Sequence, residues 1–164
     1  KYFFKENNIA LQDVKVLSRE ETIELRKKWY STFLKTILQK YPKDFYSHRC
    51  EFCDKNNKYD SPGGNDWHIF SFKLAEHEKV NRNFLKQYSI KEKKLIIAWG
   101  YCKYLAAEIP ANLVKNINFI NEDIYVFPRD CSWTFVNTHE DVYTHGFECF
   151  FARSEKVSNK VIKR

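Results

Sequence analysis

The sequence contains no methionine and no long hydrophobic run among its 164 residues. No apolar stretch approaches the roughly 20 residues that a helix needs to span a bilayer, so we expect no contact with a membrane. Residue 1 is Lys and Met is absent, which leaves open whether an N-terminal segment was removed. No signal peptide is visible in the sequence.

Several enzyme motifs are also absent. The sequence has no G-x-G-x-x-G, no G-x-x-x-x-G-K, no G-x-S-x-G and no H-E-x-x-H. Without a nucleotide-binding fingerprint, a nucleophile elbow or a zinc-protease helix, we expect no cofactor. Small single-domain proteins of this kind commonly act by binding other molecules.

Cysteine is present in an odd number, which excludes a complete set of disulfides. Five Cys cannot all pair within one chain. Three of them, Cys102, Cys131 and Cys149, lie in apolar segments, where a free Cys packs as a small core residue. We therefore predict a reducing, cytoplasmic location.

The other two Cys have the spacing C-x2-C within a polar stretch. Cys50 and Cys53 could bind one tetrahedral zinc ion, and His48 or His68 could add a nitrogen. A structural zinc site usually has four protein ligands, and no second C-x2-C or H-x3-H follows. We predict ordinary loop cysteines and no structural zinc, with zinc and a redox pair as the alternatives.

The residues that are present predict one globular domain with an aromatic-rich core. The hydrophobic fraction is 43% and the aromatic fraction 17%, with 14 Phe and 10 Tyr. These fractions are too high for a disordered chain. We predict a single domain over residues 1–153, followed by a basic, disordered tail over residues 154–164.

The net charge of +7 suggests nucleic-acid binding, because Lys and Arg clusters bind phosphates. However, Lys91, Lys93 and Lys94 stand beside Glu92, and much of the excess lies in the tail. We therefore interpret the charge as a solvated basic surface, since net charge is no evidence of fold or function by itself. Nucleic-acid binding stays an alternative.

The clearest helix start in the chain lies at Ser18. Ser18 and Glu21 form an S-x-x-E capping box, and apolar residues follow at steps of three and four up to Pro42. Such a stripe is typical of a helix that covers a sheet. A short strand is expected before it at Val14–Leu17, further helices at Leu74–Tyr88 and Tyr101–Glu108, and a connection at Ala111–Asn121.

Apolar runs of strand length predict a mixed or antiparallel sheet of about five strands. They are rich in β-branched and aromatic residues. The runs are Trp67–Phe72, Leu95–Trp99, Ile124–Phe127, Trp133–Val136 and Phe147–Phe151. Pro128–Asp130 is short enough to close an antiparallel hairpin between the third and fourth runs. With helices packed on this sheet, we predict an α+β domain.

The candidate site residues lie at the end of the Trp133–Val136 strand. Alternate side chains of an extended chain share a face, so the aromatic residues of this strand would point to the core and His139 would leave it at the rim. His139 and Glu140, with His68 as third member, are the candidates for acid–base chemistry. The candidates for binding are Trp67, Thr138 and Asp141, and no residue is assigned to a metal.

Four segments also carry a resemblance to a known family. They are W-H-I-F-S-F at Trp67–Phe72, the strand Leu95–Trp99, D-I-Y-V-F-P-R-D-C-S-W-T-F-V-N-T-H-E at Asp123–Glu140, and E-C-F-F-A-R at Glu148–Arg153. With these segments in order, the chain resembles the bacterial domain-of-unknown-function family 4275, found mainly in relatives of Bacillus, over most of Ser18–Arg153. The Cys50–Cys53 region and the tail do not match.

This resemblance implies a small single-domain protein, but it implies no activity. It marks as motif residues Trp67, His68, Trp133, Thr138, His139 and Glu140.

The sequence favours a protein-binding module of the immunity, antitoxin or inhibitor type. Proteins that neutralise basic nucleases are commonly acidic, so the positive net charge argues against that class of target. The alternatives are a metal-assisted or acid–base hydrolase using His68, His139 and Glu140, and a nucleic-acid binder. Convergence of His68 and His139 in a cleft would favour the enzyme.

Overall fold

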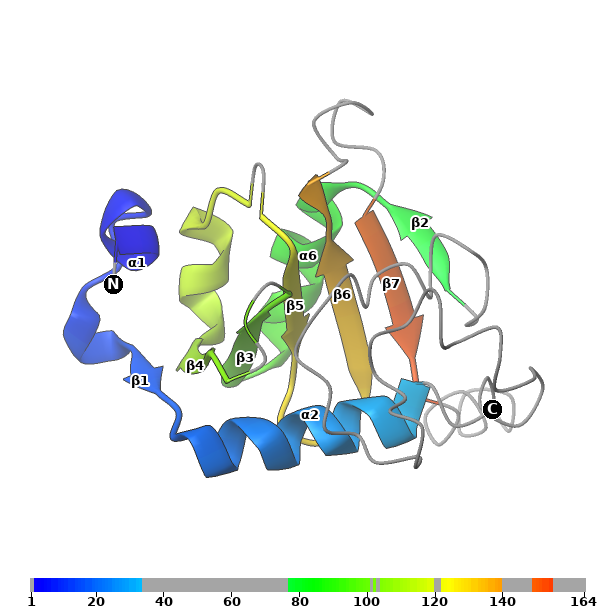
Figure 1. Cartoon of the computed structure of the whole chain (residues 1–164). Helices are drawn as coiled ribbons and strands as arrows, with labels where there is room; N and C mark the ends of the chain where they lie inside the picture. The colour runs from blue at the N-terminus through cyan, green and yellow to red at the C-terminus, as the bar shows by residue number, and fades with distance from the viewer. Residues whose placement is uncertain are drawn as a thin grey trace.

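The computed structural model describes residues 2–33, 77–100, 102, 104–119, 122–139 and 149–154. They form one antiparallel sheet of seven strands in the order β1-β4-β3-β5-β6-β7-β2 (Figure 1). The strands are β1 (Lys15–Val16), β2 (Glu78–Val80), β3 (Lys94–Trp99), β4 (Ala106–Pro110), β5 (Ile124–Phe127), β6 (Trp133–Asn137) and β7 (Cys149–Arg153). The predicted α+β class is confirmed, but the prediction of about five strands was wrong.

The helices in these ranges are short except for one. They are α1 (Tyr2–Glu6), α2 (Arg19–Phe33) and α6 (Arg82–Tyr88), with the 3₁₀ helices η1 (Leu11–Asp13), η2 (Ser89–Lys91) and η3 (Ala111–Asn116). None of the helices in the described ranges is long and apolar enough to cross a membrane.

Helix α2 begins with the capping box that its sequence predicts. The Glu21 backbone N–H donates to Ser18 Oγ (3.1 Å), and the Ser18 backbone N–H donates to Glu21 Oε2 (3.3 Å). The first bond satisfies a donor that the first turn of a helix leaves without a partner. The described part of the helix ends at Phe33, and the predicted end at Pro42 lies outside the described residues.

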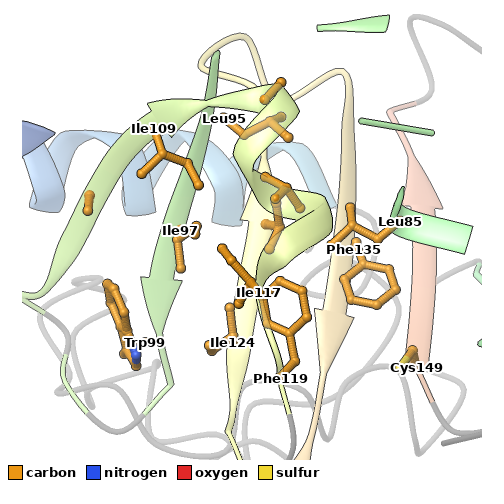
Figure 2. Close-up of a cluster of buried hydrophobic side chains, with 14 of the residues drawn as sticks. Leu85, Leu95, Ile97, Trp99, Ile109, Ile117, Phe119, Ile124, Phe135 and Cys149 are labelled. Carbon is orange, nitrogen blue, oxygen red and sulfur yellow. The ribbon is translucent and has the colours of Figure 1, made fainter. Parts of the chain in front are cut away.

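Buried side chains form two apolar cores, one on each face of the sheet. Along β3, Ile96 belongs to the core under α2, whereas Leu95 and Ile97 belong to the core under α6 and η3 (Figures 1 and 2). Trp29 anchors α2, and its Nε1 donates to Thr134 Oγ1 of β6 (2.9 Å). Because both faces are covered, the central strands are continuous apolar runs in the sequence.

The hairpin at the centre of the sheet confirms the prediction for the third and fourth runs. β5 pairs with β6 in antiparallel register, from Ile124 opposite Asn137 to Val126 opposite Phe135. β6 pairs in turn with β7, which overlaps the fifth predicted run at residues 149–151 and extends to Arg153. The first predicted run, Trp67–Phe72, lies outside the described residues.

Two predicted helices contain strands instead. Within Leu74–Tyr88, residues 78–80 form β2, which pairs with β7, and the helix begins only at Arg82. Its start is fixed by Asn81, whose side chain accepts a hydrogen bond from the Phe84 backbone N–H (3.1 Å). The predicted helix Tyr101–Glu108 was also wrong, because residues 106–108 belong to β4. There, pairing with β3 and β1 outweighs the helix propensity of Ala106 and Ala107.

A carboxylate on β4 joins three elements near the sheet edge. Glu108 accepts a hydrogen bond from Lys94 of β3 (3.0 Å) and another from Arg129 in the β5–β6 turn (2.8 Å). Burial raises the pKa of Glu108, but the two cations outweigh burial and hold the pKa below its ordinary value. Glu108 is therefore ionised at neutral pH and fixes the hairpin turn against the sheet.

Candidate functional site

His139 lies at the rim of the sheet, where β6 ends and β5 begins. Its Nδ1 is 3.0 Å from each carboxylate oxygen of Asp123, the residue that precedes β5. The His139 backbone N–H also donates to Asp123 Oδ1 (2.7 Å). The imidazole is about half exposed, whereas the carboxylate is mostly buried. Asp123 therefore fixes both the backbone and the ring of His139, and it selects the orientation of that ring.

The backbone of Asp123 is itself held at the end of β3. Its carbonyl oxygen accepts a hydrogen bond from the Gly100 backbone N–H (2.7 Å). A Cβ at Gly100 would lie 2.8 Å from the Asp123 Cβ, which is closer than carbon atoms approach. Glycine is therefore required at position 100 for Asp123 to reach this place.

The fully buried side-chain amide of Asn137 holds the backbone that leads to Asp123. Asn137 Nδ2 donates to the carbonyl oxygens of Phe119 and Glu122, both at 2.8 Å. Its Oδ1 lies 3.4 Å from the Cys149 thiol, which donates to it. The Asn137 side chain thus ties the segment that carries Asp123 to the last residue of β6 and to β7.

The surroundings of the pair are acidic. Partial burial raises the pKa of Glu122, and the charges of Asp123 and Glu6 raise it further. In the described part of the chain, no group of three or more His, Cys, Asp and Glu could hold a metal ion.

The other predicted site residues have different outcomes. Thr138 is buried, with 1% of its surface exposed, so its side chain cannot be a direct contact for a partner in this conformation. The four others, His68, Trp67, Glu140 and Asp141, lie outside the described residues. The zinc prediction for Cys50 and Cys53 also lies outside them.

A second group of polar side chains lies at the opposite end of the sheet, where β6 begins and β7 ends. Arg153 is the register partner of Trp133 on β7. Its guanidinium carbon lies 5.9 Å from the centre of the Tyr88 ring, and Lys91 Nζ lies 4.6 Å from the same centre. We call the following four residues the basic surface: Ile90, Lys91, Lys93 and Arg153.

Glu92 does not neutralise this surface, although the sequence places it between two lysines. Its carboxylate accepts a hydrogen bond from the Trp133 indole Nε1 (3.0 Å). Among the described residues, no carboxylate forms an ion pair with Lys91, Lys93 or Arg153. Neighbouring charges in the sequence therefore form no ion pairs with one another here.

Comparison with known proteins places the chain in a family. The model described as domain of unknown function (DUF4275) matches residues 4–147, which is most of the sequence. The chain belongs to the DUF4275 family. The resemblance seen in the sequence is thereby confirmed. No curated protein matches this DUF4275 chain, and no solved structure does.

The matched range contains both groups of side chains except for one residue. Asp123, Asn137 and His139 all lie within the DUF4275 match, as do the lysines of the basic surface. Arg153 lies beyond its end, so this cation is a feature of the present chain that the family match does not cover.

Proposed function

We propose that this DUF4275 protein is a protein-binding module whose contact surface is the basic surface. One observation carries the proposal. Ile90 is 75% exposed and directly precedes Lys91, one of three cations that have no carboxylate partner among the described residues. Protein interfaces commonly combine exposed apolar side chains with charged side chains that have no partner within their own chain. In such an interface, burial of the apolar side chains contributes affinity and the charges contribute specificity.

The neighbouring aromatic residues make this surface rigid. Tyr88 packs edge-on against Trp133 and Phe151, with ring centres 5.1 and 4.7 Å apart. Cations held over such an anchored ring lose less conformational entropy on binding than free side chains do. An immunity, antitoxin or inhibitor protein acts through a preformed surface of this kind.

The proposal predicts a position-specific crosslink in the native host. A photoreactive amino acid placed at Ile90 should crosslink to a protein partner, and the same residue at Lys27 should not. Lys27 is exposed on α2, which covers the other face of the sheet (Figure 1). The substitution Ile90→Asp should weaken partner binding by about tenfold or more, because an apolar anchor is replaced by a charge. Equal crosslinking from both positions would contradict the proposal.

The cysteines support a reducing, cytoplasmic location in a bacterial cell as part of this proposal. Cys102, Cys131 and Cys149 form no disulfide, and the last two are buried. Burial raises the pKa of the Cys131 thiol to about 12, which keeps it protonated and unreactive. Thiols of this kind act as small core residues.

A second candidate function is acid–base hydrolysis at His139, and one observation favours it. Asp123 binds Nδ1, so Nε2 is the ring nitrogen that would exchange a proton with a substrate. In enzymes, the carboxylate of such a pair orients the imidazole and stabilises its charged form. His68 and Glu140 would be the further members of this site.

The hydrolase candidate predicts that His139→Gln and Asp123→Asn abolish complementation of a strain that lacks the gene. General acid–base catalysis contributes about 100-fold or more to a rate, so the loss should be nearly complete. His68→Ala should have the same effect, and thermal melts should show that all three variants fold. Three folded variants with full activity in the host would remove this candidate.

A further inference from the structure

We infer that the partner of the basic surface is an acidic segment of another protein, recognised through its carboxylates. This inference rests on the proposed function and names the chemistry of the partner. Three of the four residues of the basic surface are cations, and none of the three forms an ion pair with a carboxylate among the described residues. A charge excess of one sign on one surface attracts a partner of the opposite sign and orients it before contact.

The hydrogen bond between Trp133 and Glu92 holds this carboxylate in a place where it forms no ion pair with the lysines. If the carboxylate were released, it would lie next to Lys91 and Lys93 in the sequence and would compete with an acidic partner for them. The indole thus leaves the lysines accessible to a partner, whereas the negative charge of Glu92 still opposes the binding of an acidic segment.

The aromatic residues favour a protein partner over a nucleic acid. A base of a single strand is bound by stacking on a free aromatic face. The Tyr88 ring already has Phe84 stacked against it, at 5.5 Å and 16°, and Lys91 over it. A base would have to displace one of these groups. The exposed Ile90, in contrast, offers apolar contact to a protein segment but nothing to a phosphate.

Fluorescence anisotropy with two labelled probes tests the inference on the full chain. The first probe is poly-L-glutamate and the second is an oligouridylate of the same formal charge. Poly-L-glutamate should bind, and its binding should weaken as the salt concentration rises. Each of Lys91→Ala, Lys93→Ala and Arg153→Ala should weaken it by about three- to fivefold. Glu92→Gln should strengthen it, because the amide oxygen still accepts from the indole while the negative charge is removed.

The matched control is Lys27→Ala, which removes the same charge from the α2 face. It should leave poly-L-glutamate binding unchanged. An equal loss in the control, or no binding of poly-L-glutamate at all, would overturn the inference. Tighter binding of the oligouridylate that depends on the same three cations would also overturn it, in favour of a nucleic acid. In each case a crosslink from Ile90 in the host would leave the proposed function standing, so the two can fail separately.

Discussion

The substitution Trp133→Ala is expected to lower the free energy of unfolding by about 3–5 kcal/mol, because it removes a large buried aromatic side chain and leaves a cavity. Trp133 is 3% exposed and packs edge-on against Tyr88. Its indole is also the hydrogen-bond partner of Glu92, which would lose that donor. Equilibrium unfolding in denaturant measures the effect, and a melting temperature within a degree of the wild type would contradict the expectation.

The control for the cavity is Trp133→Phe. Phenylalanine keeps much of the apolar volume but has no N–H to donate to Glu92. We expect a smaller loss of stability than for alanine, since only part of the volume and one hydrogen bond are removed. A comparison of the two variants separates packing from the hydrogen bond.

The substitution Asn137→Leu is expected to lower the free energy of unfolding by about 2–4 kcal/mol. It leaves the carbonyl oxygens of Phe119 and Glu122 without their donor in the interior, and each buried acceptor without a partner costs about 1–3 kcal/mol. Leucine has the same branched shape but a larger side chain, so the loss reports the missing hydrogen bonds together with tighter packing and not a cavity. Denaturant unfolding gives the magnitude.

The Asn137→Leu substitution should also weaken the contact between His139 and Asp123, because Asn137 holds the segment that precedes β5. The NMR signal of the His139 backbone N–H, which donates to Asp123, should shift in this variant. The matched control is Asn83→Ala, which removes an amide from the exposed side of α6. A loss of stability as large in the control as in Asn137→Leu would show that the buried hydrogen bonds are not the cause.

Much of the fold could be predicted because the central strands are buried on both faces. The apolar runs at β3, β5 and β6 were located within one residue at each end, and the capping box at Ser18 located the start of α2. The strands β2 and β4 could not be predicted. Glu78–Val80 and Ala106–Pro110 contain residues that suit a helix, and only their partners in the sheet make them strands.

The candidate site was less predictable for a related reason. Strand alternation places His139 at the end of β6, but it says nothing about which residue faces it from the start of β5. Asp123 directly precedes the run Ile124–Phe127. A carboxylate at the start of a predicted strand was the sequence signal that could have identified Asp123 as the partner of His139. The hydrogen bond between Glu92 and Trp133 could not be predicted from the sequence, because the two residues lie 41 positions apart.

The position of the two edge strands has a consequence for how the chain folds. β1 pairs with β4 across the span from Lys15 to Glu108, and β2 pairs with β7 across the span from Glu78 to Phe151. The central hairpin, in contrast, closes through the short turn around Arg129. Loop closure over a long span is entropically unfavourable, so nucleation at the hairpin and growth outward is the favoured order. During synthesis, β2 leaves the ribosome before β7, which is the last strand of the sheet to be made. β2 can therefore pair in the sheet only after β7 has been synthesised.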